Sequence, residues 1–191
     1  MAQSNILLAI QNTAKGTALT GDSTKVIQEK DNFLPSSAQG TVPNLKPFIE
    51  LTGMQWSASR TNSGAIAADG SGKTTSNVSP GPLELFKHLD AATPKLASAL
   101  KSGDKLEVYL MFLKAGVSVK GRETTDIPFF GYILKDALII SQEISAKPDE
   151  LDAQERILIS YTTLETWYTP QKNDGQPGAQ SNVQMTFHSP K

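Results

Sequence analysis

The sequence contains no cysteine in 191 residues, and its only histidines are His88 and His188. Without thiols the chain can form no disulfide, no zinc–thiolate site and no cysteine nucleophile. Neither histidine stands at a spacing typical of metal ligands, and the G-x-S-x-G pattern of serine hydrolases is missing. We therefore expect no catalytic residues, no metal and no cofactor, and we predict that the protein is not an enzyme.

Charge is also scarce and is almost balanced. Charged residues make up 19% of the chain, and 18 basic residues against 19 acidic ones give a net charge of −1. This balance favours neither nucleic acid nor an anionic membrane as a partner. A fold that buries surface against copies of itself needs fewer charges than usual, although a polar, uncharged surface gives the same percentage.

Long hydrophobic runs are missing as well. No segment approaches the length that a membrane span needs, so we expect no membrane insertion. The apolar run 6–10 is too short for a signal peptide and has no basic residues before it. We expect a protein that starts in the cytoplasm and, if secreted, leaves without a cleavable leader.

The segment 60–82 is rich in glycine and serine, and we interpret it as a loop. Within it, residues 70–74 (GSGKT) resemble a phosphate-binding loop. That motif requires a glycine where the chain has Ala67, and it also requires a strand before it and a helix after it. Nucleotide binding is therefore not expected. The loop still carries our alternative hypothesis, a small β-sandwich enzyme or ligand-binding module with its site on residues 60–82.

Most of the chain shows the two-residue period of β-strands, with turn residues between the runs. One helix is predicted over 93–102, with Thr93 as N-cap, Pro94 in the first turn and Gly103 at the C-terminal end. The pattern predicts a mainly β protein: one domain over 1–191, a two-sheet antiparallel β-barrel or sandwich with one short flanking α-helix. Strands are expected over 6–10, 48–59, 83–89, 106–113, 127–141, 156–169 and 183–187, with a further short one near 25–28.

Three of these strands carry specific expectations. In 48–59 the parity of the apolar residues changes at Gly53, which predicts a β-bulge that keeps both halves on one face. In 127–141 one side is expected to hold Tyr132, Leu134, Leu138 and Ile140. In 156–169 one face is expected to hold Ile157, Ile159, Tyr161, Thr163 and Trp167, whereas Tyr168 lies on the other face, exposed or at an interface. Thr169-Pro170 should end this strand, and a turn should follow at 173–175.

The strand 106–113 is apolar on both faces, and we cannot assign from the sequence which face points inward. In an antiparallel sheet one face is usually solvated, so the helix or another subunit must cover the second face. Leu96 and Leu100 of the helix can cover part of it. The candidate contacts between subunits are Leu96, Leu100, Tyr109, Met111 and Leu113.

Three blocks in order resemble the haemolysin-coregulated protein (Hcp) family of type VI secretion systems. The first is 49–59, a strand with Trp56. The second is 86–116, in which DAATPKL resembles the start of the family's helix and SGDK its end, before a strand ending in KAG. The third is 132–175, with LKDALIIS and YTPQKNDG. The chain departs from the family at Ser57-Ala58, where W-S-W-G is common, and in its longer 12–47 segment.

The resemblance implies both a fold and a function. It implies a two-sheet β-barrel that assembles into six-membered rings, which stack into a tube. The tube lies inside a contractile sheath, is capped by a spike protein, carries effectors in its lumen and is expelled. The partners implied are therefore further copies of the chain, the sheath, the spike protein and effectors, with no nucleic acid.

Overall fold

The computed structural model describes residues 5–27, 33–60, 78–115, 126–146 and 153–187. Within these ranges antiparallel strands dominate, as predicted, and the helices are α1 (Ser36–Gln39), the 3-10 helix η1 (Val42–Leu45) and α2 (Thr93–Ser102). The strands are β1 (Ile6–Asn12), β2 (Thr17–Ala18), β3 (Ile49–Leu51), β4 (Gly53–Gln55), β5 (Ala58–Arg60), β6 (Val78–Pro80), β7 (Leu83–His88), β8 (Leu106–Lys114), β9 (Ile127–Ser145), β10 (Gln154–Ser160), β11 (Thr163–Tyr168) and β12 (Ser181–Thr186).

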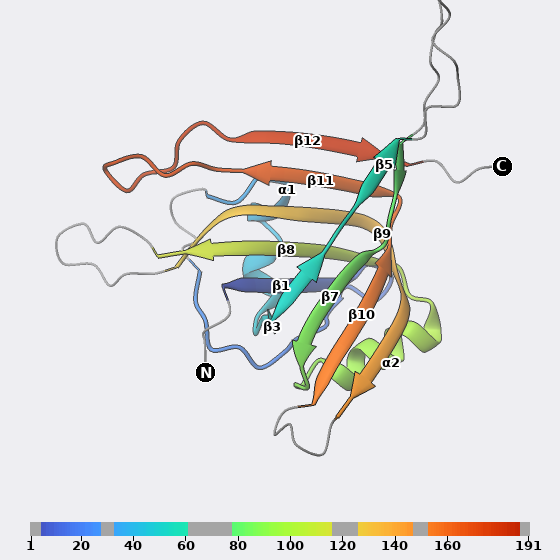
Figure 1. Cartoon of the computed structure of the whole chain (residues 1–191). Coiled ribbons are helices and arrows are strands. Elements are labelled where there is room, and N and C mark those ends of the chain that lie inside the picture. The colour runs from blue at the N-terminus through green and yellow to red at the C-terminus, as the bar shows by residue number, and fades with distance from the viewer. Residues whose placement is uncertain (1–4, 28–32, 61–77, 116–125, 147–152, 188–191) are drawn as a thin grey trace, which may run out of the picture.

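The main strands close into a barrel. In order around it, β1 pairs with β8, β8 with β9, β9 with β10 and β10 with β7. β7 then pairs with β4, which follows β3 directly, and β3 returns to β1. At this corner the N–H of Thr52 donates to the carbonyl of Phe86 at 2.8 Å. Closure removes free edges from the barrel itself, whereas β11 and β12 continue the sheet outward from β9 (Figure 1).

β9 belongs to both halves of the barrel. Its first half pairs with β11 and its second half with β10, and in Figure 1 it bends between them. The bend lies near Asp136, which has a left-handed φ of 48° and marks a shift in the register with β8. One extra residue reverses the parity beyond this point. Tyr132 and Leu134 therefore pack on the barrel core, while Leu138 and Ile140 are exposed, so the prediction that all four share one side is wrong.

The corner at Gly53 also differs from the prediction. Ile49 and Leu51 are buried in the barrel core, and Met54 and Trp56 pack against the same core. The predicted common face is therefore confirmed. The cause is a break after Leu51, where the chain changes its partner from β1 to β7, rather than a bulge within one strand.

The predicted strand 156–169 is likewise two strands. β10 ends at Ser160 and β11 begins at Thr163, so the face changes between them. Tyr161 packs in the barrel core, whereas Trp167 lies in a second core on the opposite side of the sheet. β11 ends before Thr169-Pro170 as predicted, and the turn over 173–175 is confirmed by the left-handed φ of 83° at Gly175.

The helix α2 has the predicted bounds, and it contacts β9. Its C-terminal Gly103 has a φ of 64° and donates its N–H to the carbonyl of Ala99 at 3.0 Å. The N-cap position is Ala92, not Thr93 as predicted. The Thr93 hydroxyl instead accepts from the N–H of Asp90 at 3.2 Å and donates to Glu155 at 2.6 Å.

Candidate assembly surface

The second apolar face of β8 is covered by the chain's own segment 33–48. Tyr109, Met111 and Leu113 of β8 form a second core together with Ile133 and Trp167. The residues that close this core from outside are Leu34, Ala38, Val42, Leu45 and Phe48. In Figure 1, α1 lies behind the sheet, on the side away from β5 and β7. Neither the helix α2 nor a second subunit is needed to keep this face dry.

The five candidate contact residues lie inside the fold or against its core. Leu96 is fully buried in the barrel core, and Leu100 is half-buried against it. Tyr109, Met111 and Leu113 are all buried beneath the segment 33–48. Four of the five are therefore enclosed by the chain itself and only Leu100 keeps exposed surface, so contact of these residues with another copy stays a prediction. The sequence signal that was missed is the set of apolar residues spaced along 33–48.

Polar contacts fix this covering segment in place. The Ser37 hydroxyl donates to the carboxylate of Glu165 at 3.2 Å and 3.3 Å, and the buried Thr169 hydroxyl donates to the carbonyl of Phe33 at 2.9 Å. Burial raises the pKa of the Tyr109 phenol, and the nearby Glu107 carboxylate acts in the same direction. The phenol therefore stays neutral, which suits a position beneath a packed cover.

A buried ionic network joins the start of α2 to the barrel. Lys87 Nζ lies 2.7 Å from Glu155 Oε2 and 2.8 Å from Asp90 Oδ1, and it also donates to the carbonyl of His88 at 2.7 Å. Gln142 Nε2 donates to the other oxygen of Glu155 at 2.6 Å. Every charge in this network has a partner, so its role is structural: it orients α2 and is not a free site for a ligand.

The strands β11 and β12 extend the sheet beyond the barrel. On this extension, the side of the sheet that faces the core within the barrel is partly exposed and rich in aromatic residues. Cross-strand pairing puts Phe130 of β9 between Phe112 of β8 and Tyr168 of β11. Two residues along these strands, Thr166 of β11 lies between Tyr132 of β9 and Val183 of β12. The Phe112 and Phe130 ring centroids are 5.4 Å apart, and those of Phe130 and Tyr132 are 5.2 Å apart. We call this surface the aromatic face; its residues are Phe112, Phe130, Tyr132, Tyr168 and Val183.

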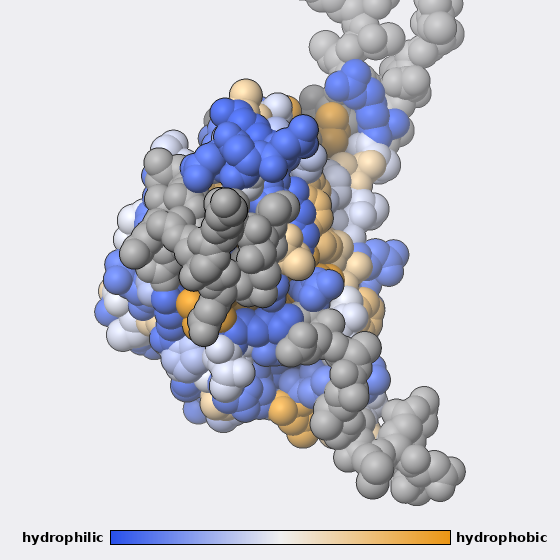
Figure 2. All heavy atoms as spheres, turned by 90° about the vertical axis from the view of Figure 1, so that its left-hand side faces the viewer, coloured by the Kyte–Doolittle hydropathy of each residue, from blue (hydrophilic) through white to orange (hydrophobic). Residues whose placement is uncertain are grey.

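The aromatic face is only partly covered. Tyr168 is 44% exposed and Val183 62% exposed, and the three remaining residues are half-buried. β12, which forms its outer strand, carries no charged residue. Figure 2 shows hydrophobic atoms gathered in a band right of centre, on the side that faces forward in Figure 1. The placement of Tyr168 outside the core agrees with the sequence prediction.

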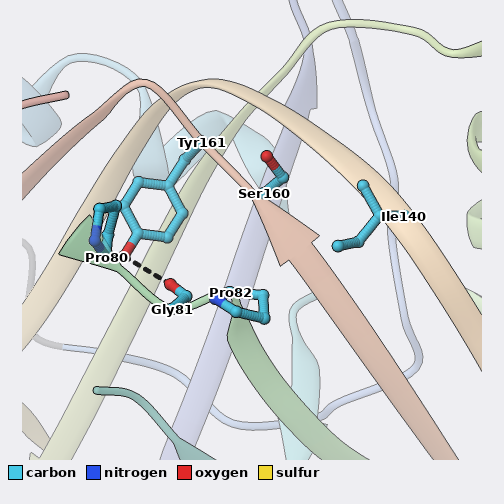
Figure 3. Close-up of a pocket in the computed structure, with 6 residues that line it drawn as sticks. All are labelled: Pro80, Gly81, Pro82, Ile140, Ser160 and Tyr161. Carbon is cyan, nitrogen blue, oxygen red and sulfur yellow. Dashed lines mark hydrogen bonds between the residues drawn. The ribbon is translucent and has the colours of Figure 1, made fainter. Parts of the chain in front are cut away.

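A second exposed apolar surface lies where β9 leaves the bend. Leu138 and Ile140 are 37% and 51% exposed, and near Ile140 lie Pro80, which is half-buried, and Pro82, which is exposed. We call these four residues the apolar ridge. Next to Ile140 is a shallow hollow of about 170 Å³, lined also by Gly81, Ser160 and Tyr161. In Figure 3 the Tyr161 hydroxyl points to the Gly81 carbonyl, and the two groups are 3.1 Å apart.

The alternative site on residues 60–82 is only partly visible, because 61–77, including Lys73, lie outside the described residues. The hollow at the end of this segment is smaller than the roughly 300–1,000 Å³ of typical ligand pockets. Two side-chain hydroxyls line it, those of Ser160 and Tyr161, and the Tyr161 hydroxyl is already hydrogen-bonded to Trp56 and Gly81. No cluster of three potential metal ligands occurs in the described part of the chain, and no helix there could span a membrane.

Comparison with known proteins identifies the family. The sequence matches the family model described as "Type VI secretion system effector, Hcp" over residues 39–168, which is more than half of the chain. The chain belongs to the Hcp family. It is therefore a type VI secretion protein, of a family that is secreted and whose role is structural. No curated protein sequence matches this Hcp chain.

Solved structures show the same fold. A structure titled as a type six secretion system protein matches with a TM-score of 0.66 and 22% identity over 95% of each chain. Hcp1 from E. coli EAEC 042 gives a TM-score of 0.65 at 13% identity, over 97% of this chain and 100% of that one. Hcp3 from Pseudomonas aeruginosa gives 0.57 at 15% identity, over 96% and 99%. The sequence resemblance and the predicted mainly β fold are thus confirmed.

Proposed function

We propose that this Hcp-family chain is the tube protein of a type VI secretion system. Six copies join head to tail into a closed ring, and the rings stack into a tube whose lumen carries effectors. The tube assembles in the cytoplasm inside the sheath and below the spike protein, and it is secreted through the type VI system. In this role the protein is structural: it is not an enzyme, and it needs no nucleic acid and no insertion into a membrane.

The observation that carries this proposal is family membership combined with a whole-chain match to Hcp folds. The surface of the chain adds support, because the aromatic face leaves Tyr168 and Val183 exposed. Contiguous apolar surface of this kind on a soluble chain usually binds something. The balanced net charge of −1 also suits an assembly of identical copies, since they do not repel one another strongly.

The alternative, an enzyme or ligand-binding module with its site at 60–82, has less support. A small-molecule site needs a concave pocket with a few free polar groups. The hollow beside Ile140 is shallow, and the Tyr161 hydroxyl in it already has two hydrogen-bond partners.

Light scattering coupled to size exclusion tests the proposal directly. At roughly 50 µM, where even weak interfaces form, the protein should have about six times the 20.5 kDa mass of one chain. Negative-stain images should show rings with a central hole. A monomer at this concentration, with no rings in the images, would remove the main support for the tube.

A further inference from the structure

We propose that in the assembly the aromatic face of one copy packs against the apolar ridge of the next. This inference rests on the proposed function, because it identifies the two surfaces that a ring of identical copies would join. The partner is therefore a second copy of this chain, and the contact is head to tail rather than between two equal surfaces.

The aromatic face has the composition of the centre of an interface. Aromatic residues are enriched and charged residues are depleted in such centres. Here the rings of Phe112, Phe130 and Tyr132 pack against one another across β8 and β9, tilted or edge to face, and form a base beside which Tyr168 and Val183 are exposed. Rings already held by their neighbours lose little conformational freedom when a partner covers them, which favours binding.

The apolar ridge is the matching surface because a closed ring requires two different patches on each copy. Leu138 and Ile140 are exposed only because the bulge at Asp136 turns them outward. The hollow of about 170 Å³ beside Ile140 accommodates one apolar side chain from a neighbour. On the aromatic face, Val183 is the most exposed apolar residue and the natural one to enter it.

Charges near the two surfaces have opposite sign. Beside the aromatic face, the Lys114 ammonium lies 5.2 Å from the Phe129 ring centroid, and Phe129 packs edge-on against Tyr168. On β9, three residues beyond Ile140 of the ridge, Glu143 shares Arg156 with Glu84, and this group of three side chains carries one net negative charge. This complementarity favours contact of the face with the ridge over contact of either surface with itself.

The two surfaces cannot cover each other within one copy. Trp56 lies between them: its ring centroid is 5.7 Å from that of Tyr132 on the aromatic face, and its indole N–H donates to Tyr161, which lines the hollow. Tyr161 in turn donates to the carbonyl of Gly81, next to β6. These contacts hold the face and the ridge apart at a fixed separation, so each surface can be covered only from outside.

Two substitutions at exposed positions test the pairing: Val183→Glu on the face and Ile140→Glu on the ridge. Because both side chains are more than half exposed, both variants should fold, and circular dichroism checks this. Ser98→Glu, at an exposed position of α2 away from both surfaces, is the matched control and should keep the mass of the wild type. Each test variant alone should fall to the mass of one chain in light scattering.

The decisive measurement is an equimolar mixture of the two test variants. Val183→Glu keeps an intact ridge and Ile140→Glu keeps an intact face, so the mixture should form a dimer of about twice the mass of one chain, and no ring. The native chain has no cysteine, so a Val183→Cys, Ile140→Cys double variant should also give ladders of linked chains under oxidation. Val183→Cys with Ser98→Cys should not.

The outcomes separate this inference from the proposed function. Rings that persist in both glutamate variants, or a mixture that remains monomeric, overturn the face-to-ridge contact and leave the tube proposal standing. Linked pairs from Val183→Cys alone would indicate contact between two faces and overturn it as well. A wild-type protein that is monomeric overturns both proposals together.

Discussion

Lys87 and Glu155 form a fully buried ion pair, with Nζ and Oε2 2.7 Å apart. Removal of one partner leaves an uncompensated charge in the interior, which typically costs about 3–5 kcal/mol. We therefore expect Lys87→Met to lower the free energy of unfolding by about that amount in urea titrations. The double variant Lys87→Met, Glu155→Gln should regain part of the loss, since the Glu155 charge is removed as well, while Asp90 is still left without its cation.

A matched control for this prediction is the ion pair of Arg156 and Glu84, in which the Arg156 side chain is 39% exposed. Arg156→Met should cost much less than Lys87→Met, because water screens such a pair. Equal losses in Lys87→Met and Arg156→Met would contradict the view that burial makes the difference.

Gly131 is expected to tolerate no side chain. A Cβ at this position would lie 2.0 Å from the carbonyl oxygen of Leu110 and 2.9 Å from the Trp167 ring. The first of these is backbone and cannot move aside, so Gly131→Ala should destabilise the protein by about 3 kcal/mol or prevent folding. Gly40→Ala, where nothing lies within 4 Å of the new Cβ, should leave the thermal midpoint nearly unchanged.

Glutamate pairs on the two faces of β8 should both abolish folding. Val108 and Leu110 lie in the barrel core, and Tyr109 and Met111 lie in the second core beneath residues 33–48. A buried carboxylate without a partner is costly in either place. Circular dichroism of Val108→Glu, Leu110→Glu and of Tyr109→Glu, Met111→Glu should show loss of β structure in both. A folded monomer from the second pair would mean that the segment 33–48 does not cover this face in solution.

Alkaline pH should destabilise the protein. Burial raises the pKa of Tyr132 and, as the largest of several effects, the pKa of Tyr161 above the ordinary value of 10.0. Above this value the unfolded chain loses phenol protons that the folded chain retains, so the stabilisation is complete below about pH 10 and declines as pH rises further. Urea midpoints at about pH 9 and about pH 11 should show the decline, and Tyr161→Phe should reduce it.

Most of the strands and the helix α2 could be predicted from the sequence, because their periodicity and turn residues are local properties. It failed where one residue changes the register. Nothing in the run from Tyr132 to Ile140 indicates that Asp136 adopts a left-handed conformation, yet this single residue moves Leu138 and Ile140 from the core side to the surface. The break at Tyr161 and Thr162 changes the face in the same way.

The candidate site was harder to predict than the fold. The two apolar faces of β8 correctly indicated that something covers the second one. A sequence does not show, however, that the cover comes from residues 33–48 of the same chain, because that contact joins segments about 60 to 80 positions apart. The aromatic face was missed for a related reason: its residues come from four strands, and only their register brings them together.

The closed ring of strands also determines when this chain can fold during synthesis. β1 leaves the ribosome first, but its long partner β8 begins only at Leu106, and β7 must wait for β10, which begins at Gln154. The barrel therefore cannot close until roughly four fifths of the chain has emerged. Pairings between distant segments form slowly and leave strand edges open meanwhile. The nascent chain before closure is thus the stage most exposed to aggregation.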